Sequence, residues 1–191
     1  KKLFFKTLIF FLITTNLFSI EPDVFVQSTV NRASSLLSEN ISKDEKIEKL
    51  KQIAKDTVDI RGIGFYTLGA VRKTINVDQK VKYSKLFEEY FLKSFSSRLA
   101  EYTNPEINVY AKEKLSENYT IVNSILKATD DRPEVKIDWR IYTKDPNKPL
   151  IRDLIIEGLS LARPQKEEFN SVLPTNDGDI NALFKTLESF I

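Results

Sequence analysis

The sequence predicts an α+β fold in which a four-stranded antiparallel sheet packs against several helices. Three observations lead to this prediction. Apolar residues recur at helical spacing over most of residues 22–102, alternate with polar residues in four segments between residues 107 and 157, and return to helical spacing after residue 158. Consecutive strands flanked by helices are typical of the α+β class. The length of 191 residues fits one domain by the usual range of ~100–200 residues.

Residues 1–19, KKLFFKTLIFFLITTNLFS, have the layout of a secretory signal peptide, with a basic start, an apolar run and a small residue at Ser19. The apolar run is well short of the ~20 residues that cross a bilayer. A signal peptide is therefore favoured over a membrane anchor or a buried N-terminal helix. We expect cleavage after Ser19 and a single domain over residues 20–191, located outside the cytoplasm.

The composition excludes several kinds of chemistry. The chain has no Cys and no His, so thiol nucleophiles, imidazole bases and the usual zinc ligands are not available. Three of the 29 Lys and Arg lie in residues 1–19, which contain no Asp or Glu. From Ile20 onward the chain therefore has 26 basic and 27 acidic residues, a net charge near zero. A near-neutral chain with interspersed charges is not typical of a nucleic-acid-binding protein. We expect no metal, no cofactor and no nucleic-acid partner.

Two helices are predicted at the start of the domain. Over residues 22–40 one apolar stripe is formed by Val26, Val30, Ala33, Leu36 and Leu37. Ser42, with Glu45 three residues later, forms a capping box that opens the second helix, which carries Ile47, Leu50, Ile53, Ala54 and Val58. Residues 59–70 hold three of the five glycines and are predicted to be a loosely helical or turn-rich connector.

A third, long helix is predicted over residues 78–102. Its broad aromatic face consists of Tyr83, Phe87, Tyr90, Phe91, Phe95 and Tyr102, with Leu99 between the last two. The four predicted strands follow at residues 107–111, 119–125, 135–141 and 150–157, joined by hairpin-like connections into an antiparallel meander. Helices at residues 164–173 and 179–190 complete the chain, the last one after the turn sequence Asn176-Asp177-Gly178.

The aromatic residues favour a cavity over an ordinary packed core. The chain has 13 Phe, 7 Tyr and 1 Trp. A long helix with a wide apolar face, lying over a curved sheet with its own apolar face, tends to enclose a cone-shaped apolar space, and such sites are few per protein. On the third strand, Ile137 and Trp139 share the apolar face, whereas Asp138 lies on the opposite face with Lys136 and Arg140. The cavity would therefore receive no acid or base from this strand.

Two other motifs are candidates for reactive sites. Gly62-Ile63-Gly64 is followed by Gly69, which lies five positions after the second glycine. A dinucleotide-binding loop requires its third glycine three positions after the second and a strand before the motif, and no strand is predicted here. Tight packing between helices explains these glycines better. Asp138, Asp153 and Glu157 are candidate general acids only if they face the cavity, and the alternation in the fourth strand leaves its faces unassigned.

Five sequence elements, in this order, resemble the MlaC family, the toluene-tolerance proteins of Gram-negative periplasms. They are Asp59 with Leu68-Gly69, then Gln79, Tyr83, Phe87 and Tyr90, then Leu99 and Tyr102, then Asp138-Trp139-Arg140-Ile141, and finally Asp153-Leu154-Ile155-Ile156-Glu157-Gly158-Leu159-Ser160-Leu161 followed by Glu168-Phe169. The resemblance extends from Pro22 to Leu187.

The resemblance implies a phospholipid-binding domain with a nuclear-transport-factor-like cone and extra helices. It implies a periplasmic carrier that holds a phospholipid by its acyl chains and shuttles it between an outer-membrane lipoprotein complex and an inner-membrane ABC transporter, maintaining lipid asymmetry. No catalytic residues are implied. From this sequence itself we expect the cavity lining to include Leu68, Phe87, Phe91, Val109, Ile121, Ile137, Trp139, Leu154 and Ile156.

Two other functions remain open. A small isomerase or dehydratase on the same fold would act on an apolar substrate, and it would need at least one carboxylate on the apolar face. An adaptor protein would use the helices of residues 22–58 as a docking surface and would have a tightly packed interior. A cavity without a free carboxylate would favour the carrier over both.

Overall fold

The computed structural model describes residues 19–191, so the predicted signal peptide lies outside the described residues except for Ser19. The helices before the sheet are α1 (Pro22–Ser38), α2 (Lys43–Thr57), α3 (Ile60–Thr67), the 3-10 turn η1 (Gly69–Lys73) and α4 (Val77–Leu99). The helices after it are α5 (Ala162–Val172), the 3-10 turn η2 (Pro174–Asn176) and α6 (Ile180–Phe190). Among the described residues, no helix combines the length and the hydropathy that a bilayer crossing requires.

The sheet is an antiparallel meander in the order β1-β2-β3-β4-β5. Its strands are β1 (Ile107–Ser116), β2 (Tyr119–Leu126), β3 (Val135–Tyr142), β4 (Leu150–Ile156) and β5 (Leu159–Ser160). The prediction of four strands was therefore one too few. Glu157 and Gly158 both have positive φ, 50° and 81°, which makes a tight two-residue hairpin between β4 and β5. A strand of two residues is too short to show alternation.

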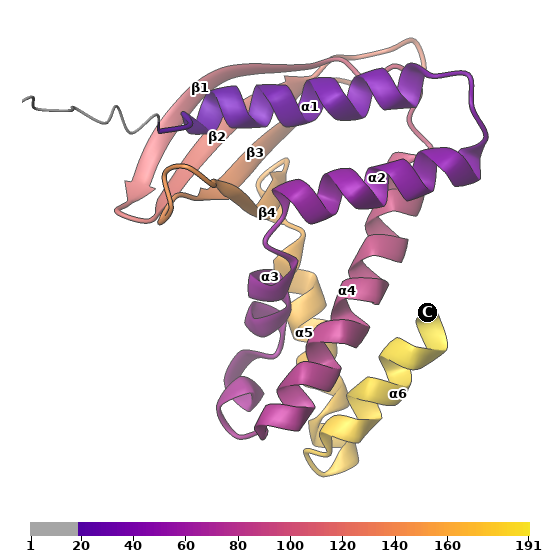
Figure 1. Cartoon of the computed structure of the whole chain (residues 1–191), viewed down its shortest axis with the longest axis vertical. Helices are drawn as coiled ribbons and strands as arrows, with labels where there is room; N and C mark the ends of the chain where they lie inside the picture. Colours follow the sequence, from indigo (N-terminus) through magenta and orange to yellow (C-terminus); the bar gives the residue numbers. More distant parts are fainter. Residues whose placement is uncertain (1–18) are drawn as a thin grey trace, which may run out of the picture.

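The helices are arranged in two groups around the sheet. Figure 1 shows α1 lying along the sheet beside β1 and β2, with α2 next to it, and α3, α4, α5 and α6 forming a column that extends away from the sheet. α4 runs along this column and ends close to α2. The buried residues of the sheet and of most helices join in one main core, and a smaller core of Leu36, Leu37 and Leu50 lies between α1 and α2.

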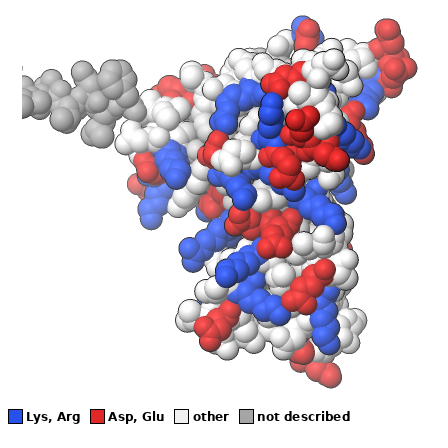
Figure 2. Space-filling model, turned by 45° about the vertical axis from the view of Figure 1, so that its right-hand side comes forward, with Lys and Arg blue, Asp and Glu red and all other residues white. Residues whose placement is uncertain are grey.

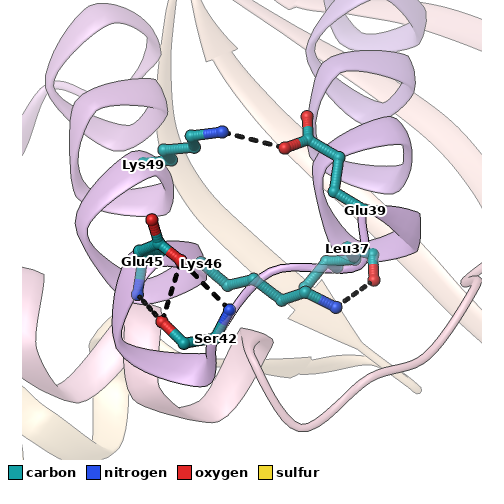
Figure 3. Close-up of polar contacts among 6 residues, drawn as sticks. All are labelled: Leu37, Glu39, Ser42, Glu45, Lys46 and Lys49. Atoms are coloured by element: carbon teal, nitrogen blue, oxygen red, sulfur yellow. Dashed lines mark hydrogen bonds and ion pairs between the residues drawn. The ribbon is translucent and has the colours of Figure 1, made fainter.

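The turn between α1 and α2 is fixed by the predicted capping box. Figure 3 shows the Ser42 hydroxyl oxygen accepting from the Glu45 backbone N–H at 3.2 Å and the Glu45 carboxylate accepting from the Ser42 N–H at 3.2 Å. Two lysines then reach back to α1: Lys46 Nζ donates to the Leu37 carbonyl at 2.7 Å, and Lys49 pairs with Glu39 at 2.8 Å. These contacts hold α1 and α2 as a helical hairpin.

The glycine-rich connector is more regular than expected, because Asp59 caps a true helix, α3. The Asp59 carboxylate accepts from the Gly62 N–H at 2.8 Å. A Cβ at Gly64 would lie 2.8 Å from Cδ1 of Phe87, so this glycine lets α3 pack directly on α4. The prediction of tight packing between helices therefore holds for Gly64, whereas a Cβ at Gly62 would meet the side chains of Arg152 on β4 and of Asp59.

A bulge decides which residues of β4 face the helices. β3 alternates as predicted, with Ile137, Trp139 and Ile141 buried. Arg140 pairs with Asp153 and Ile141 pairs with Ile151, so Arg152 is an extra residue on β4. The Arg152 guanidinium reaches Asp59, donating from Nε at 2.7 Å, and contacts the Tyr119 hydroxyl at 3.1 Å. This ion pair ties the start of α3 to the sheet.

Charges of both signs are mixed on the surface. Figure 2 shows Lys and Arg interspersed with Asp and Glu over the visible face. Several of them pair between helices, including Lys55 with Glu88 at 3.7 Å and Lys82 with Glu188 at 2.9 Å. Exposed pairs of this kind contribute at most ~1 kcal/mol each to stability.

Candidate functional site

A cavity with two adjoining sections lies between the helices and the inner face of the sheet. The larger section, of about 270 Å³, is bounded by α1, α2, the end of α4 and strands β1 to β4. The smaller section, of about 180 Å³, is bounded by α3, α4, α5, β3 and β4. The two sections share part of their walls, formed by Val58, Phe95, Arg98, Trp139, Ile151, Leu154 and Leu161.

Trp139 occupies the shared wall in a fixed orientation. Its indole N–H donates to the Ser124 hydroxyl oxygen at 2.8 Å, and that hydroxyl donates to the Ile137 carbonyl at 2.9 Å. The polar atom of the indole is therefore satisfied inside the protein, as a buried donor requires. The rest of the ring system contributes apolar surface to both sections.

The aromatic face of α4 forms the opposite wall. Spacing by four residues places Phe87, Phe91 and Phe95 on one side of the helix, with ring centroids 6.2 and 5.3 Å apart in succession. Tyr83 continues the stack, 5.7 Å from Phe87, but lies in the core and shares a hydrogen bond of 2.8 Å with Thr67. Burial raises the pKa of the Tyr83 hydroxyl, which stays neutral.

Six of the nine predicted lining residues border the cavity. Phe87 and Phe91 line the smaller section, Ile137 and Ile156 the larger one, and Trp139 and Leu154 both. Their contact with a ligand stays a prediction.

The other three predicted residues, Leu68, Val109 and Ile121, lie outside both sections. Leu68 is fully buried in the main core, and Val109 is half-buried against it. Ile121 pairs with Arg140 across β2 and β3 and alternates with Val122, which is buried on the inner face. Both faces of β2 carry apolar residues, so alternation in the sequence did not identify the inner one.

The contribution of α1 and α2 was missed. Their residues in the larger section are Thr29, Val30, Ala33, Ser34, Leu37, Leu50, Ile53, Ala54 and Thr57. The apolar residues of these two segments were predicted as helical stripes, and none of them was expected in the cavity lining. The available signal was Ala33, a small residue in the apolar stripe of α1, followed by the small Ser34, since small side chains leave space between a helix and its neighbours.

Asp153 is the one carboxylate among the lining residues of the described chain, and it is 5% exposed. Oδ2 accepts from the Ser160 hydroxyl at 2.6 Å, and Oδ1 accepts from the Ala162 N–H at 3.2 Å. These bonds join β4 to β5 and to the start of α5. Within residues 19–191, no group of three or more His, Cys, Asp or Glu is placed to hold a metal ion. The described lining of the two sections is mainly apolar.

Apart from Asp153 on β4, the polar lining of the smaller section lies along α4 and α5. The Tyr90 hydroxyl donates to Oε1 of Gln165 at 2.6 Å, which bridges the two helices. Partial burial is the main cause that raises the pKa of Tyr90, and the nearby charge of Glu168 adds to it. Arg98 and Ser94 complete this lining on α4.

Comparisons with known proteins identify a family and a shared fold. The family described as MlaC protein matches residues 27–189 of the chain. No curated protein matches the sequence. Among solved structures, the phospholipid-binding protein from Ralstonia solanacearum, determined in complex with a phospholipid, superposes with a TM-score of 0.75 over 90% of this chain and 97% of its own, at 17% sequence identity. At this identity the likeness establishes a shared fold.

Proposed function

The chain belongs to the MlaC family, and from that membership and the cavity we propose that it is a lipid carrier that holds a phospholipid by its acyl chains. The observation that carries the proposal is the two-section apolar cavity with Trp139 and Leu154 in its shared wall. The phospholipid in the Ralstonia solanacearum protein, which has the same fold, supports it.

The dimensions of the cavity suit acyl chains. The two sections, of about 270 and 180 Å³, are many times larger than the ~10–15 Å³ that a single buried water needs. Each section is therefore proposed to hold one acyl chain. Because each methylene kept from water is worth ~0.8 kcal/mol, the chains supply enough binding energy without specific polar contacts inside the sections.

The proposal includes transport between membranes. A carrier that shields acyl chains allows a phospholipid to cross an aqueous compartment, here the periplasm. An outer-membrane lipoprotein complex and an inner-membrane ABC transporter are the proposed donor and acceptor, in keeping with the family to which the chain belongs. The basic and apolar character of residues 1–19 supports export to that compartment.

The alternative functions receive less support from the site. An isomerase or dehydratase would need a carboxylate free to exchange protons with a substrate. Both oxygens of Asp153 accept hydrogen bonds that position β5 and α5. An adaptor would need no internal space, whereas α1 and α2, its proposed docking helices, line the larger section of the cavity.

Native mass spectrometry of protein purified without detergent tests the proposal. We expect a complex whose added mass corresponds to one phospholipid, released as intact lipid on denaturation. A protein that shows no added mass, and that takes up no lipid when mixed with phospholipid vesicles, would contradict the carrier function.

A further inference from the structure

Arg98 has an unusual place at the cavity. It lies in the last turn of α4, and its side chain lines both sections although the residue is exposed. Among the lining residues in the described part of the chain, it is the only Lys or Arg. A guanidinium at the rim of an apolar cavity marks the point where a ligand's polar end would leave it.

The Arg98 guanidinium has no partner within residues 19–191: it donates no hydrogen bond there, pairs with no carboxylate and lies over no aromatic ring. Six of the other seven arginines in residues 19–191 differ, and the seventh, Arg72, is exposed in η1 and borders neither section. Arg32, Arg140, Arg152 and Arg163 pair with carboxylates, and Arg61 and Arg132 lie over the rings of Phe65 and Tyr102. The donors of Arg98 are therefore available to a ligand.

The shape of the cavity places a ligand's branch point near this residue. The two sections meet at a shared wall that includes Arg98, Phe95 and Leu161, and Leu161 is 47% exposed. The two acyl chains of a phospholipid likewise diverge from one glycerol, which carries the phosphate. If each section holds one chain, the glycerol lies at the shared wall and the phosphate lies at its exposed edge.

We propose that Arg98 binds the phosphate of the lipid head group while the two acyl chains occupy the two sections. The proposal rests on the proposed carrier function and adds a recognition residue to it. Guanidinium groups bind phosphate oxygens through paired, charge-assisted hydrogen bonds. Since the phosphate is common to phospholipids, Arg98 separates them from lipids without a phosphate but does not distinguish among their polar head groups.

The experiment compares two lipids with the same acyl chains, one with a phosphate-containing head group and one without a phosphate. Wild-type protein, Arg98→Ala and Arg98→Lys are titrated with phosphatidylglycerol and with a diacylglycerol carrying the same chains. Arg72→Ala is the control, because Arg72 is also exposed and lies in η1, away from the cavity. Inorganic phosphate is titrated separately, which distinguishes a head-group site from a site for free phosphate.

We expect Arg98→Ala to bind phosphatidylglycerol roughly tenfold more weakly than the wild type. This is the lower end of the range of contributions from hydrogen bonds to charged groups, because the Arg98 side chain is exposed. Diacylglycerol affinity should not change, Arg98→Lys should retain part of the phosphatidylglycerol affinity, and Arg72→Ala should behave as the wild type. Inorganic phosphate should not bind measurably without the chains.

Three results would overturn the assignment of Arg98: unchanged phosphatidylglycerol affinity in Arg98→Ala, an equal loss for both lipids, or tight binding of inorganic phosphate alone. The first two results include lipid binding by the wild type, and the third concerns phosphate rather than lipid, so none of them contradicts the carrier function. Wild-type protein that binds neither lipid would instead contradict the carrier function itself.

Discussion

Filling the larger section of the cavity should remove lipid without harming the fold. Ala33 lies on α1 and lines this section together with Val30 and Leu37. In a close-packed core, enlarging a residue costs ~1–3 kcal/mol of stability because neighbours must move. In a cavity of about 270 Å³, the added ring has space, so Ala33→Phe should leave the free energy of unfolding within ~1 kcal/mol of the wild type.

The size of the binding defect follows from the displaced methylenes. Phe has about six more carbons than Ala and takes the place of about as many methylenes, at ~0.8 kcal/mol each. The upper limit is therefore ~5 kcal/mol, or ~1,000-fold or more in affinity. An acyl chain that bends around the ring recovers part of this energy, so we expect a loss between ~10-fold and ~1,000-fold.

The assay measures transfer of a phospholipid from vesicles to the purified variant, together with urea unfolding of the same preparation. Ala111→Phe is the matched control, since Ala111 is exposed on β1 and borders neither section. Wild-type lipid uptake by a folded Ala33→Phe protein would refute the assignment of the chains to this section. If Ala33→Phe unfolds while the control does not, the region is a packed core and the cavity argument fails.

Two further substitutions test the framework around the cavity. Asp59→Ala breaks the ion pair with Arg152 and the cap of α3, so we expect the free energy of unfolding in urea to fall by about 2–4 kcal/mol. The control Asp56→Ala breaks the exposed pair with Arg32 and should cost less than ~1 kcal/mol. Equal effects of the two substitutions would contradict the argument that the more buried ion pair contributes more to stability. Tyr83→Phe removes one buried hydrogen bond, while the Thr67 hydroxyl still donates to the Gly64 carbonyl at 2.7 Å. We therefore expect the free energy of unfolding to fall by ~0.5–1.5 kcal/mol and the lipid content to stay unchanged. A loss of bound lipid would show that Tyr83 acts on the cavity.

The architecture was largely predictable because its patterns are local. The stripe of α1, the capping box at Ser42 and the alternation of β3 each depend on residues close together in the sequence. The start of α4 was predicted within one residue, and the structure explains it: the Asn76 side chain accepts from the Gln79 N–H at 2.8 Å, in a second capping box. The end of α4 came earlier than predicted, at Leu99, since Tyr102 already belongs to the turn toward β1.

The features that were missed depend on contacts between distant segments. The inner face of β2 is decided by its pairing with β3, which places Val122 inside and Ile121 outside. The faces of β4 depend on the bulge at Arg152, whose partner Asp59 is 93 residues away in the sequence. The lining residues of α1 and α2 were recognised as apolar, but only the packed structure separates a helix that fills a core from one that leaves space beside it.

Fluorescence of Trp139 gives the most direct test that acyl chains occupy the cavity. Trp139 is the single Trp of the chain and lies in the wall shared by both sections. Bromine atoms on an acyl chain quench an indole only at close approach, so the signal reports chains beside this residue. We expect strong quenching when the protein takes up phospholipid with brominated chains and none with the same lipid unbrominated. Lipid uptake without a difference between the two would show that the chains bind elsewhere and would contradict the account.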